Sequence, residues 1–166
     1  PEPCYSGATY GGYAKRHNPF MYFESIAADP GLCRNVVPAD GRLAADLGSK
    51  KGLRTFTWLT PNLCNDGHDC GLATVDSWLA AWVPRMTRKL GPEGVLVVTF
   101  DEGYGAGLHV PTLFVGPGAR KGVRLTGPFD HYSLLATIES RYHLRRINEA
   151  AAALPMKGAM LRTHGR

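Results

Sequence analysis

The sequence predicts an α/β fold with a mostly parallel sheet, on the evidence of three consecutive segments. Residues 54–59 (RTFTWL) alternate β-branched and aromatic side chains, as a strand does. Residues 94–100 (GVLVVTF) form the near-continuous apolar run of a strand that is covered on both faces. Between them, residues 74–91 carry a large apolar side chain at every fourth position from Trp78 to Leu90, which predicts an amphipathic helix. Strand, helix and strand in this order predict a βαβ unit with two parallel strands.

Two short helices are expected before this unit. Residues 19–28 carry apolar side chains at helical spacing, with Asn18 as the N-cap and Pro19 at the first helical position. A second short helix is expected around Leu43, ending at Gly48.

The segments that follow residue 100 predict a return strand and a last helix. Residues 110–116 (VPTLFVG) follow the previous strand too closely for a helical crossover, so an antiparallel hairpin is expected. Asp130 is expected to cap a helix that places Leu134 or Leu135, Ile138 and Tyr142 toward the core. We assign residues 1–150 to one domain and residues 151–166 to a tail.

Composition and charge exclude several classes of protein. The chain has 166 residues, 44% of them hydrophobic and 20% charged, which suits one globular domain. Its longest apolar run is only strand-sized, so no transmembrane segment is expected. The net charge of +5 comes from scattered basic residues without an aromatic-interleaved stripe, so nucleic acid is not an expected partner. Because the first residue is Pro1, we expect the chain to be part of a longer protein.

The four cysteines lie at positions 4, 33, 64 and 70, with spacings that differ from those of zinc knuckles. A bridge between Cys64 and Cys70 would close a small loop and leave Cys4 to pair with Cys33. This pairing implies an oxidising compartment, and the protein is then secreted or periplasmic. The alternative is four buried free thiols in a cytosolic protein.

Acidic and histidine residues follow both strands of the predicted parallel pair. Ligands bind beyond the carboxyl ends of the strands in open α/β sheets, so these residues are expected to share one sheet edge. The antiparallel return strand begins with His109 at that same edge. The residues expected there are Asp66, His68, Asp69, Asp101, Glu102 and His109.

Two kinds of chemistry are expected at this edge. Asp101 and Glu102 adjoin a buried strand, and a divalent cation would compensate their charge, the alternative being that both face solvent. His68 has Asp66 and Asp69 close enough to fix its tautomer, which suits proton transfer or binding of an anionic oxygen. The alternative for this segment is a purely structural loop.

His17 and His131 each adjoin the expected N-terminus of a helix, a position that attracts anions such as phosphate. Both are candidate catalytic residues, although a histidine beside a cap is also common without any function. The chain contains neither a G-x-S-x-G elbow nor a Walker loop, so no nucleophile is identified.

Five segments, taken in order from about Cys4 to Leu144, resemble the C-terminal half of a known family. It is the bacterial phosphoesterase family of phospholipase C-like enzymes and secreted acid phosphatases, within the alkaline phosphatase superfamily. The segments are KRHNPFMYFESI, TFTWLTPNLCNDGHDC, VLVVTFDEG, HVPTLFVGPGAR and DHYSLLATIESRYHL.

The resemblance implies an α/β/α sandwich of alkaline phosphatase type, incomplete in this chain, and metal-dependent hydrolysis of phosphoric esters. The substrate would be a phospholipid, a nucleotide or a simple monoester. Asp101 and Glu102 correspond to the family's metal-binding acidic pair, and His109 to a looser third position. His68, with Asp66 and Asp69, corresponds to the family's phosphate-facing loop, and His17 corresponds to the histidine of the family's HNPF-type segment. His131 is a further candidate.

The chain also departs from the family's pattern. The upstream half of the family carries a Ser or Thr nucleophile and a Glu-Asn metal-binding motif, and this chain begins after both. We therefore expect the missing N-terminal half as a partner and no activity from these residues alone. The rival interpretations are a non-catalytic binding or scaffold module that retains the fold, and a metal-binding protein with structural cysteines.

Overall fold

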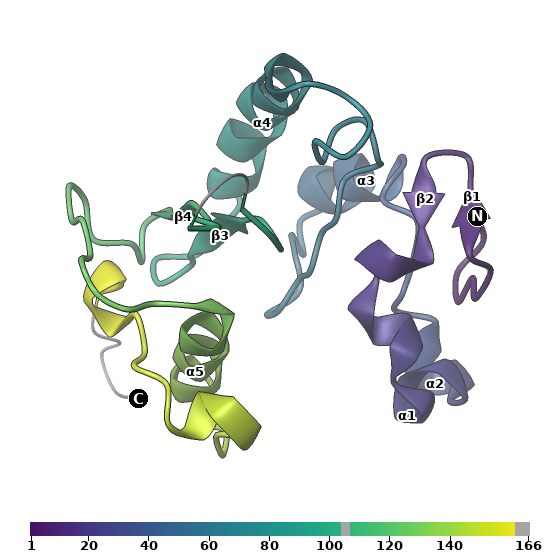
Figure 1. The fold of residues 1–166 in the computed structure, drawn as a ribbon. Coiled ribbons are helices and arrows are strands. Elements are labelled where there is room, and N and C mark those ends of the chain that lie inside the picture. Colours follow the sequence, from purple (N-terminus) through teal and green to yellow (C-terminus); the bar gives the residue numbers. More distant parts are fainter. Residues whose placement is uncertain (104–106, 162–166) are drawn as a thin grey trace. The chain divides into compact units, whose positions relative to one another are not determined.

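The computed structural model describes residues 1–103 and 107–161 (Figure 1). The chain forms two compact units, Pro1–Lys89 and Leu90–Arg166. Helices and short strands occur in both units, as an α/β chain requires. Within the described ranges, no helix has both the length and the hydropathy needed to cross a bilayer.

The first unit begins with a two-stranded antiparallel ribbon of β1 (Thr9–Tyr10) and β2 (Tyr13–Ala14). Gly11 adopts a φ of 54° in the connecting turn, a conformation that glycine reaches without a Cβ clash. Ala14 is buried at the end of β2. The segment that carries His17 therefore begins directly after the ribbon.

The expected helix over residues 19–28 is broken into short pieces. The chain forms the 3₁₀ turns η1 (Lys15–His17) and η2 (Pro19–Tyr22), then a single turn of helix, α1 (Glu24–Ala27). Asn18 does not cap by its side chain; its Nδ2 donates instead to the Tyr13 hydroxyl at 3.3 Å. Phe23 takes an extended conformation between η2 and α1, which interrupts the helix.

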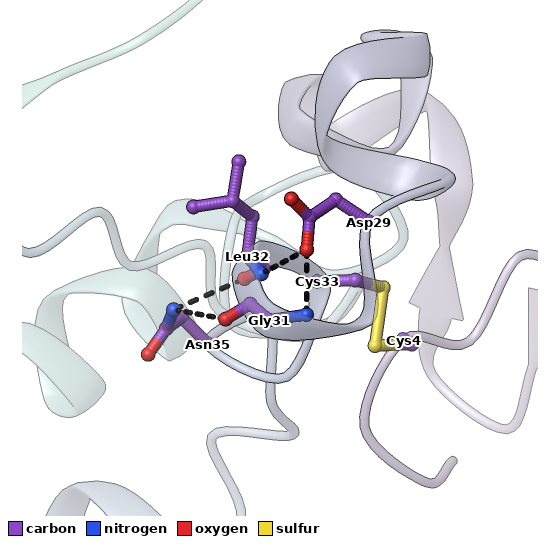
Figure 2. Close-up of a disulfide and its surroundings, with 6 residues drawn as sticks. All are labelled: Cys4, Asp29, Gly31, Leu32, Cys33 and Asn35. Atoms are coloured by element: carbon purple, nitrogen blue, oxygen red, sulfur yellow. Dashed lines mark hydrogen bonds between the residues drawn. A yellow bond between two sulfur atoms is a disulfide. The ribbon is translucent and has the colours of Figure 1, made fainter.

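A disulfide between Cys4 and Cys33 attaches the N-terminal segment to α2 (Pro30–Cys33), as Figure 2 shows. Asp29 caps this helix, with its Oδ1 accepting from the backbone N–H groups of Gly31 at 2.7 Å and Leu32 at 3.1 Å. The Cys4 N–H donates to the backbone carbonyl of Val36 at 3.0 Å, beside the bridge. The expected pairing of these two cysteines is confirmed.

Two longer helices complete the first unit. The helix expected around Leu43 is confirmed as α3 (Arg42–Gly48), with Leu43 and Leu47 buried. The helix expected over residues 74–91 forms as α4 (Leu72–Thr87), which begins two residues earlier and ends before Gly91. Val75 and Met86 form its buried face.

The expected strand at residues 54–59 is not formed, and this part of the fold prediction is wrong. The segment is neither strand nor helix, and Phe56 and Trp58 are exposed. A strand needs a neighbouring strand to satisfy its backbone N–H and C=O groups, and no partner pairs with this segment in the two described sheets. The alternating pattern specifies which side chains share a face, but it does not by itself place a neighbouring strand beside the segment.

The second unit contains the antiparallel hairpin of β3 (Leu96–Thr99) and β4 (Thr112–Val115). The hairpin prediction is confirmed, and its register pairs Leu96 with Val115. Every residue of β3 is only half-buried, so the expectation of a strand covered on both faces is not met. Because both described sheets are antiparallel and two-stranded, the described residues contain no parallel sheet and do not confirm the sandwich.

The last helix, α5 (His131–Arg141), begins where the sequence predicts. Asp130 Oδ1 accepts from the Ser133 N–H at 2.8 Å, and Ser133 Oγ accepts from the Asp130 N–H in return. The buried face is nevertheless different from the expected one, because small and polar side chains occupy it. The buried residues of α5 are Ser133, Ala136, Thr137 and Glu139, whereas Leu134, Leu135 and Ile138 are half-buried and Tyr142 is exposed.

Residues after α5 pack against it through two 3₁₀ turns, η3 (Asn148–Ala151) and η4 (Lys157–Ala159). The Thr137 hydroxyl accepts from the Met156 N–H at 2.7 Å, which explains why a polar side chain occupies the buried face. An isolated bridge joins Ala119 to Met160. Residues 151–161 of the assigned tail thus contact the core of the unit, and its last five residues lie outside the described ones.

Gly116 provides a test of the packing around the hairpin. It has a φ of 125°, and a Cβ there would lie 2.7 Å from Leu90 Cδ1 and 2.8 Å from the Gly94 carbonyl oxygen. We expect Gly116→Ala to lower the free energy of unfolding by about 2 kcal/mol or more, from backbone strain and a backbone clash. Urea unfolding measures this change.

Gly91→Ala is the matched control, because nothing lies within 4 Å of a Cβ at that position. It should change the free energy of unfolding by less than about 0.5 kcal/mol. Equal effects of the two substitutions would contradict the packing described for Gly116.

Candidate functional site

The loop of residues 61–70 is held in place by three local constraints. A disulfide joins Cys64 to Cys70, with Cα atoms 4.6 Å apart, which confirms the second expected pairing. The Leu63 N–H donates to the Gly12 carbonyl at 2.9 Å, which attaches the loop to the turn of the β1–β2 ribbon. Gly67 turns the chain with a φ of 96°. The loop is therefore fixed against the segment that carries His17.

His17 and Asp66 form the centre of the site. The distance between His17 Nδ1 and Asp66 Oδ2 is 2.9 Å, and the two side chains are only 19% and 13% exposed. A carboxylate accepts hydrogen bonds and donates none, so the proton lies on His17 Nδ1. The other Asp66 oxygen, Oδ1, accepts from the backbone N–H of His68 at 2.9 Å. Both oxygens of Asp66 are thereby oriented, and His17 Nε2 makes no hydrogen bond among the described residues.

His68 lies beside this pair and has polar partners on both ring nitrogens. Its ring centroid is 5.5 Å from that of His17, at a tilt of 58°. Nδ1 lies 2.7 Å from Asp69 Oδ1, and Nε2 lies 3.1 Å from Arg16 Nη2. His68 and Asp69 are about half-exposed, so this part of the cluster is open to solvent.

Two further residues support His17 from the backbone side. The Thr60 hydroxyl donates to the His17 carbonyl at 3.0 Å, and Trp58 Nε1 donates to the same hydroxyl oxygen at 3.1 Å. Sequence analysis missed Thr60 and Arg16. The basic pair Lys15 and Arg16 next to His17 was a visible signal for the second, whereas Thr60 had none.

In the second unit, His131 reaches the end of β3. Its Nε2 lies 2.8 Å from the backbone carbonyl oxygen of Phe100 and donates to it, because a carbonyl only accepts. Phe100 immediately precedes Asp101, so the N-terminus of α5 lies beside the acidic pair in space. Asp101 and Glu102 are exposed. The structure thus brings together His131 and the start of the acidic pair.

His109 lies beside the residue that follows Glu102. A Cβ on Gly103 would lie 2.7 Å from the backbone N of His109, so the segment after Glu102 and the start of the return strand are in contact. The His109 side chain is exposed, as is that of Leu108. Residues 104–106, which connect Gly103 to Gly107, lie outside the described part of the chain.

The predicted metal ligands are of the chemical type that binds a divalent cation, but few of them lie together. Carboxylates such as Asp101 and Glu102 are the hard oxygen ligands that these ions prefer. Among the described residues, however, no group of three or more histidine, cysteine or acidic side chains is placed to hold a metal ion. Any cation held here would need ligands from elsewhere.

The predicted site residues fall into two groups, one in each unit. The expectation that they share one edge of a parallel sheet has no support in the described residues, because that sheet is not formed there. Hydrogen bonds and ring contacts gather the first group around His17, and α5 and the hairpin gather the second around the end of β3. The first group is Arg16, His17, Asp66, His68 and Asp69; the second is Asp101, Glu102, His109 and His131.

Comparison with known proteins identifies the class. Residues 4–145 match the model of the Phosphoesterase family, and the chain belongs to that family. The expected resemblance is thereby confirmed. The match includes both groups of site residues.

Individual relatives include phosphatases from bacteria and fungi. The chain is 29% identical to the phosphatidylinositol-3-phosphatase of Mycobacterium tuberculosis, over 88% of this chain and 47% of the relative. It is 32% identical to a probable acid phosphatase of Kluyveromyces lactis, over 80% of this chain and 32% of the relative. An acid phosphatase of Aspergillus fumigatus is 24% identical over 87% of this chain and 35% of the relative. The chain thus spans about a third to a half of the length of these relatives, and no solved structure matches it.

The two disulfides should differ in their contribution to stability. In the loop-closure model, the Cys64–Cys70 bridge, with a sequence separation of 6, contributes about 2 kcal/mol. The Cys4–Cys33 bridge, with a separation of 29, contributes about 3.5 kcal/mol. Replacing each pair by serine and measuring urea unfolding under non-reducing conditions tests this order. A larger loss for the shorter loop would show that loop closure is not the main effect.

Proposed function

We propose that this chain forms part of a hydrolase of phosphoric esters, with His17 and Asp66 as its acid–base pair. The observation that carries the proposal is the 2.9 Å contact between these two partly buried side chains, of which Asp66 lies in a loop closed by a disulfide. Membership of the Phosphoesterase family supports the reaction class. The proposal concerns the whole protein, of which these residues supply one part of the site.

Asp66 gives His17 the arrangement that a general acid needs. Its carboxylate accepts from Nδ1–H and orients the ring, so that a proton carried by Nε2 can be donated to a ligand. When the bond between phosphorus and the leaving oxygen breaks, the Nε2 proton passes to that oxygen, and the ring returns to its neutral form. Thr60 keeps the backbone of His17 in place while the proton moves. His68 and Asp69 belong to the side of the cluster that faces the phosphoryl group.

Phosphate monoesters are the substrate class we favour within this function. The relatives are named phosphatidylinositol-3-phosphatase and acid phosphatase, and such enzymes remove a terminal phosphate. Phospholipase C-like cleavage of a phosphodiester is the other expected activity, and none of the three names describes it. We also propose that the protein is secreted or periplasmic, which the two disulfides support.

The nucleophile is assigned to no residue of this chain. In the family resemblance, a serine or threonine upstream attacks phosphorus, and the proposal places that group in the remaining part of the protein. His131 is proposed to assist at the end of β3, since its Nε2 holds the Phe100 carbonyl next to Asp101. The non-catalytic binding module remains the rival for a protein that lacks such a nucleophile.

Substitutions of the acid–base pair test the proposal in the full-length protein. His17→Ala should lower kcat for a chromogenic phosphate monoester by about 100-fold or more, because the leaving oxygen loses its proton donor. Asp66→Asn should lower kcat by about 10- to 100-fold, because the ring loses its orienting carboxylate. A phosphocholine ester, assayed in parallel, distinguishes monoesters from diesters.

Asp46→Asn is the control for the loss of a negative charge. Asp46 pairs with Arg42 on the exposed surface of α3, at 2.9 Å, and takes no part in the cluster. Its substitution should leave kcat within about twofold. Full activity of His17→Ala would refute the assignment of the acid, and an inactive wild-type protein would favour the binding module.

We further propose a divalent cation that takes Asp101 and Glu102 as two of its ligands, with His109 as a looser candidate. When bound, such an ion would neutralise negative charge on the phosphoryl oxygens. Chelation should abolish activity, and added Mg²⁺, Mn²⁺ or Zn²⁺ should restore it. Asp101→Asn should raise the metal concentration required by about tenfold or more, whereas Asp76→Asn, an exposed acid on α4, should not. Full activity in chelator would refute the cation.

A further inference from the structure

The contact between Arg16 and His68 determines which nitrogen of His68 carries a proton. A guanidinium has five N–H donors and no acceptor, so the 3.1 Å contact between Arg16 Nη2 and His68 Nε2 requires a lone pair on Nε2. The proton of the neutral ring then lies on Nδ1, which donates to Asp69 Oδ1 at 2.7 Å. Both ring nitrogens of His68 are therefore engaged within the cluster.

This arrangement gives His68 a different role from the one that its sequence position indicates. While both bonds hold, the ring has no N–H group to offer a phosphoryl oxygen. It acts instead on Arg16, whose guanidinium it holds with a neutral acceptor, while Asp69 keeps the ring in the required tautomer. His68 is therefore a positioning residue for Arg16.

Arg16 has the donors that His68 lacks. Within the residues that the structure describes, its guanidinium makes no hydrogen bond other than that to His68, and the residue is exposed. Its remaining N–H groups form a planar fork that matches two oxygens of one phosphoryl group. Arg16 also directly precedes His17, whose ring lies 5.5 Å from that of His68. The guanidinium of Arg16 and the ring of His17 thus lie beside the same part of the site.

We propose that Arg16 is a phosphate-binding residue of this site and that His68 holds its guanidinium in the binding orientation. The inference rests on the proposed function and identifies the group that recognises the phosphoryl moiety. Arg16 binds two phosphoryl oxygens, and His17 serves the leaving oxygen. The chemistry recognised is the phosphoryl group itself, whether it belongs to a substrate or to free inorganic phosphate.

The test measures KM and inhibition by inorganic phosphate in the full-length protein, with a soluble monoester as the substrate. Arg16→Met should raise both KM and the inhibition constant for phosphate by about tenfold or more, with a smaller change in kcat, because a charge-assisted contact is lost. Arg16→Lys keeps the charge but loses the fork, so its constants should lie between those of the wild type and Arg16→Met.

Lys15→Met is the matched control, because it removes the same charge from the adjacent residue. The Lys15 ammonium lies 4.8 Å from the centre of the Tyr22 ring, and the residue has no contact with His68 among the described residues. Its substitution should change both constants by less than about twofold, since a long-range contribution from its charge alone is screened by water and salt.

His68 variants separate positioning from simple structural support. His68→Leu removes the acceptor and should reproduce the tenfold increase of Arg16→Met in the phosphate inhibition constant. His68→Gln offers Oε1 as an acceptor for Arg16 and should restore most of the affinity. A purely structural role would instead give similar losses in both variants, together with a lower melting temperature.

The outcomes distinguish this inference from the function on which it rests. Unchanged KM and phosphate inhibition in Arg16→Met, in a protein that still depends on His17, would overturn the role of Arg16 and leave the hydrolase intact. Equal effects of Arg16→Met and Lys15→Met would also overturn it, because general charge would then explain both. A wild-type protein that hydrolyses no phosphoester would remove the proposed function and this inference together.

Discussion

The hydrogen bond between His17 and Asp66 is the interaction on which the cluster of the first unit depends. It joins residues 49 positions apart in the sequence, so it forms only where the tertiary structure brings their segments together. The Cys64–Cys70 bridge and the bond from Leu63 to Gly12 restrict the loop before any ligand arrives. Asp66 then orients His17 with one oxygen and the backbone of His68 with the other, and the contact from His68 to Arg16 follows from that placement.

The second unit organises its polar residues by a different device. The register of β3 and β4 sets where β3 ends, and the capped N-terminus of α5 brings His131 to the carbonyl of Phe100 at that end. The acidic pair that follows is exposed, and among the described residues no group of three or more histidine, cysteine or acidic side chains is placed to hold a metal ion. A strand with apolar side chains on both faces is here only half-buried.

Local features of the fold were predictable because they depend on neighbouring residues. Asp130 caps α5 through its own first turn, and Leu43 and Leu47 lie one helical turn apart in α3. Cys64 and Cys70 are close enough in sequence that their bridge follows from a tight loop. The segment 54–59 failed as a strand because alternation fixes which side chains share a face, but a strand also needs a partner elsewhere in the chain. The buried face of α5 was misjudged for a similar reason, since Thr137 is buried by its bond to Met156.

The sequence by itself determined the family and the candidate residues, because motifs carry that information directly. It also indicated the pairing of the cysteines, because the short spacing of Cys64 and Cys70 left Cys4 to pair with Cys33. It also identified His17, Asp66 and His68 as candidate site residues. Only the tertiary structure decided their partners: Asp66 for His17, and Asp69 with Arg16 for His68. The physical reason is that a hydrogen bond depends on the distance and direction between two atoms. For residues 16 and 68, those quantities depend on the path of all the intervening chain.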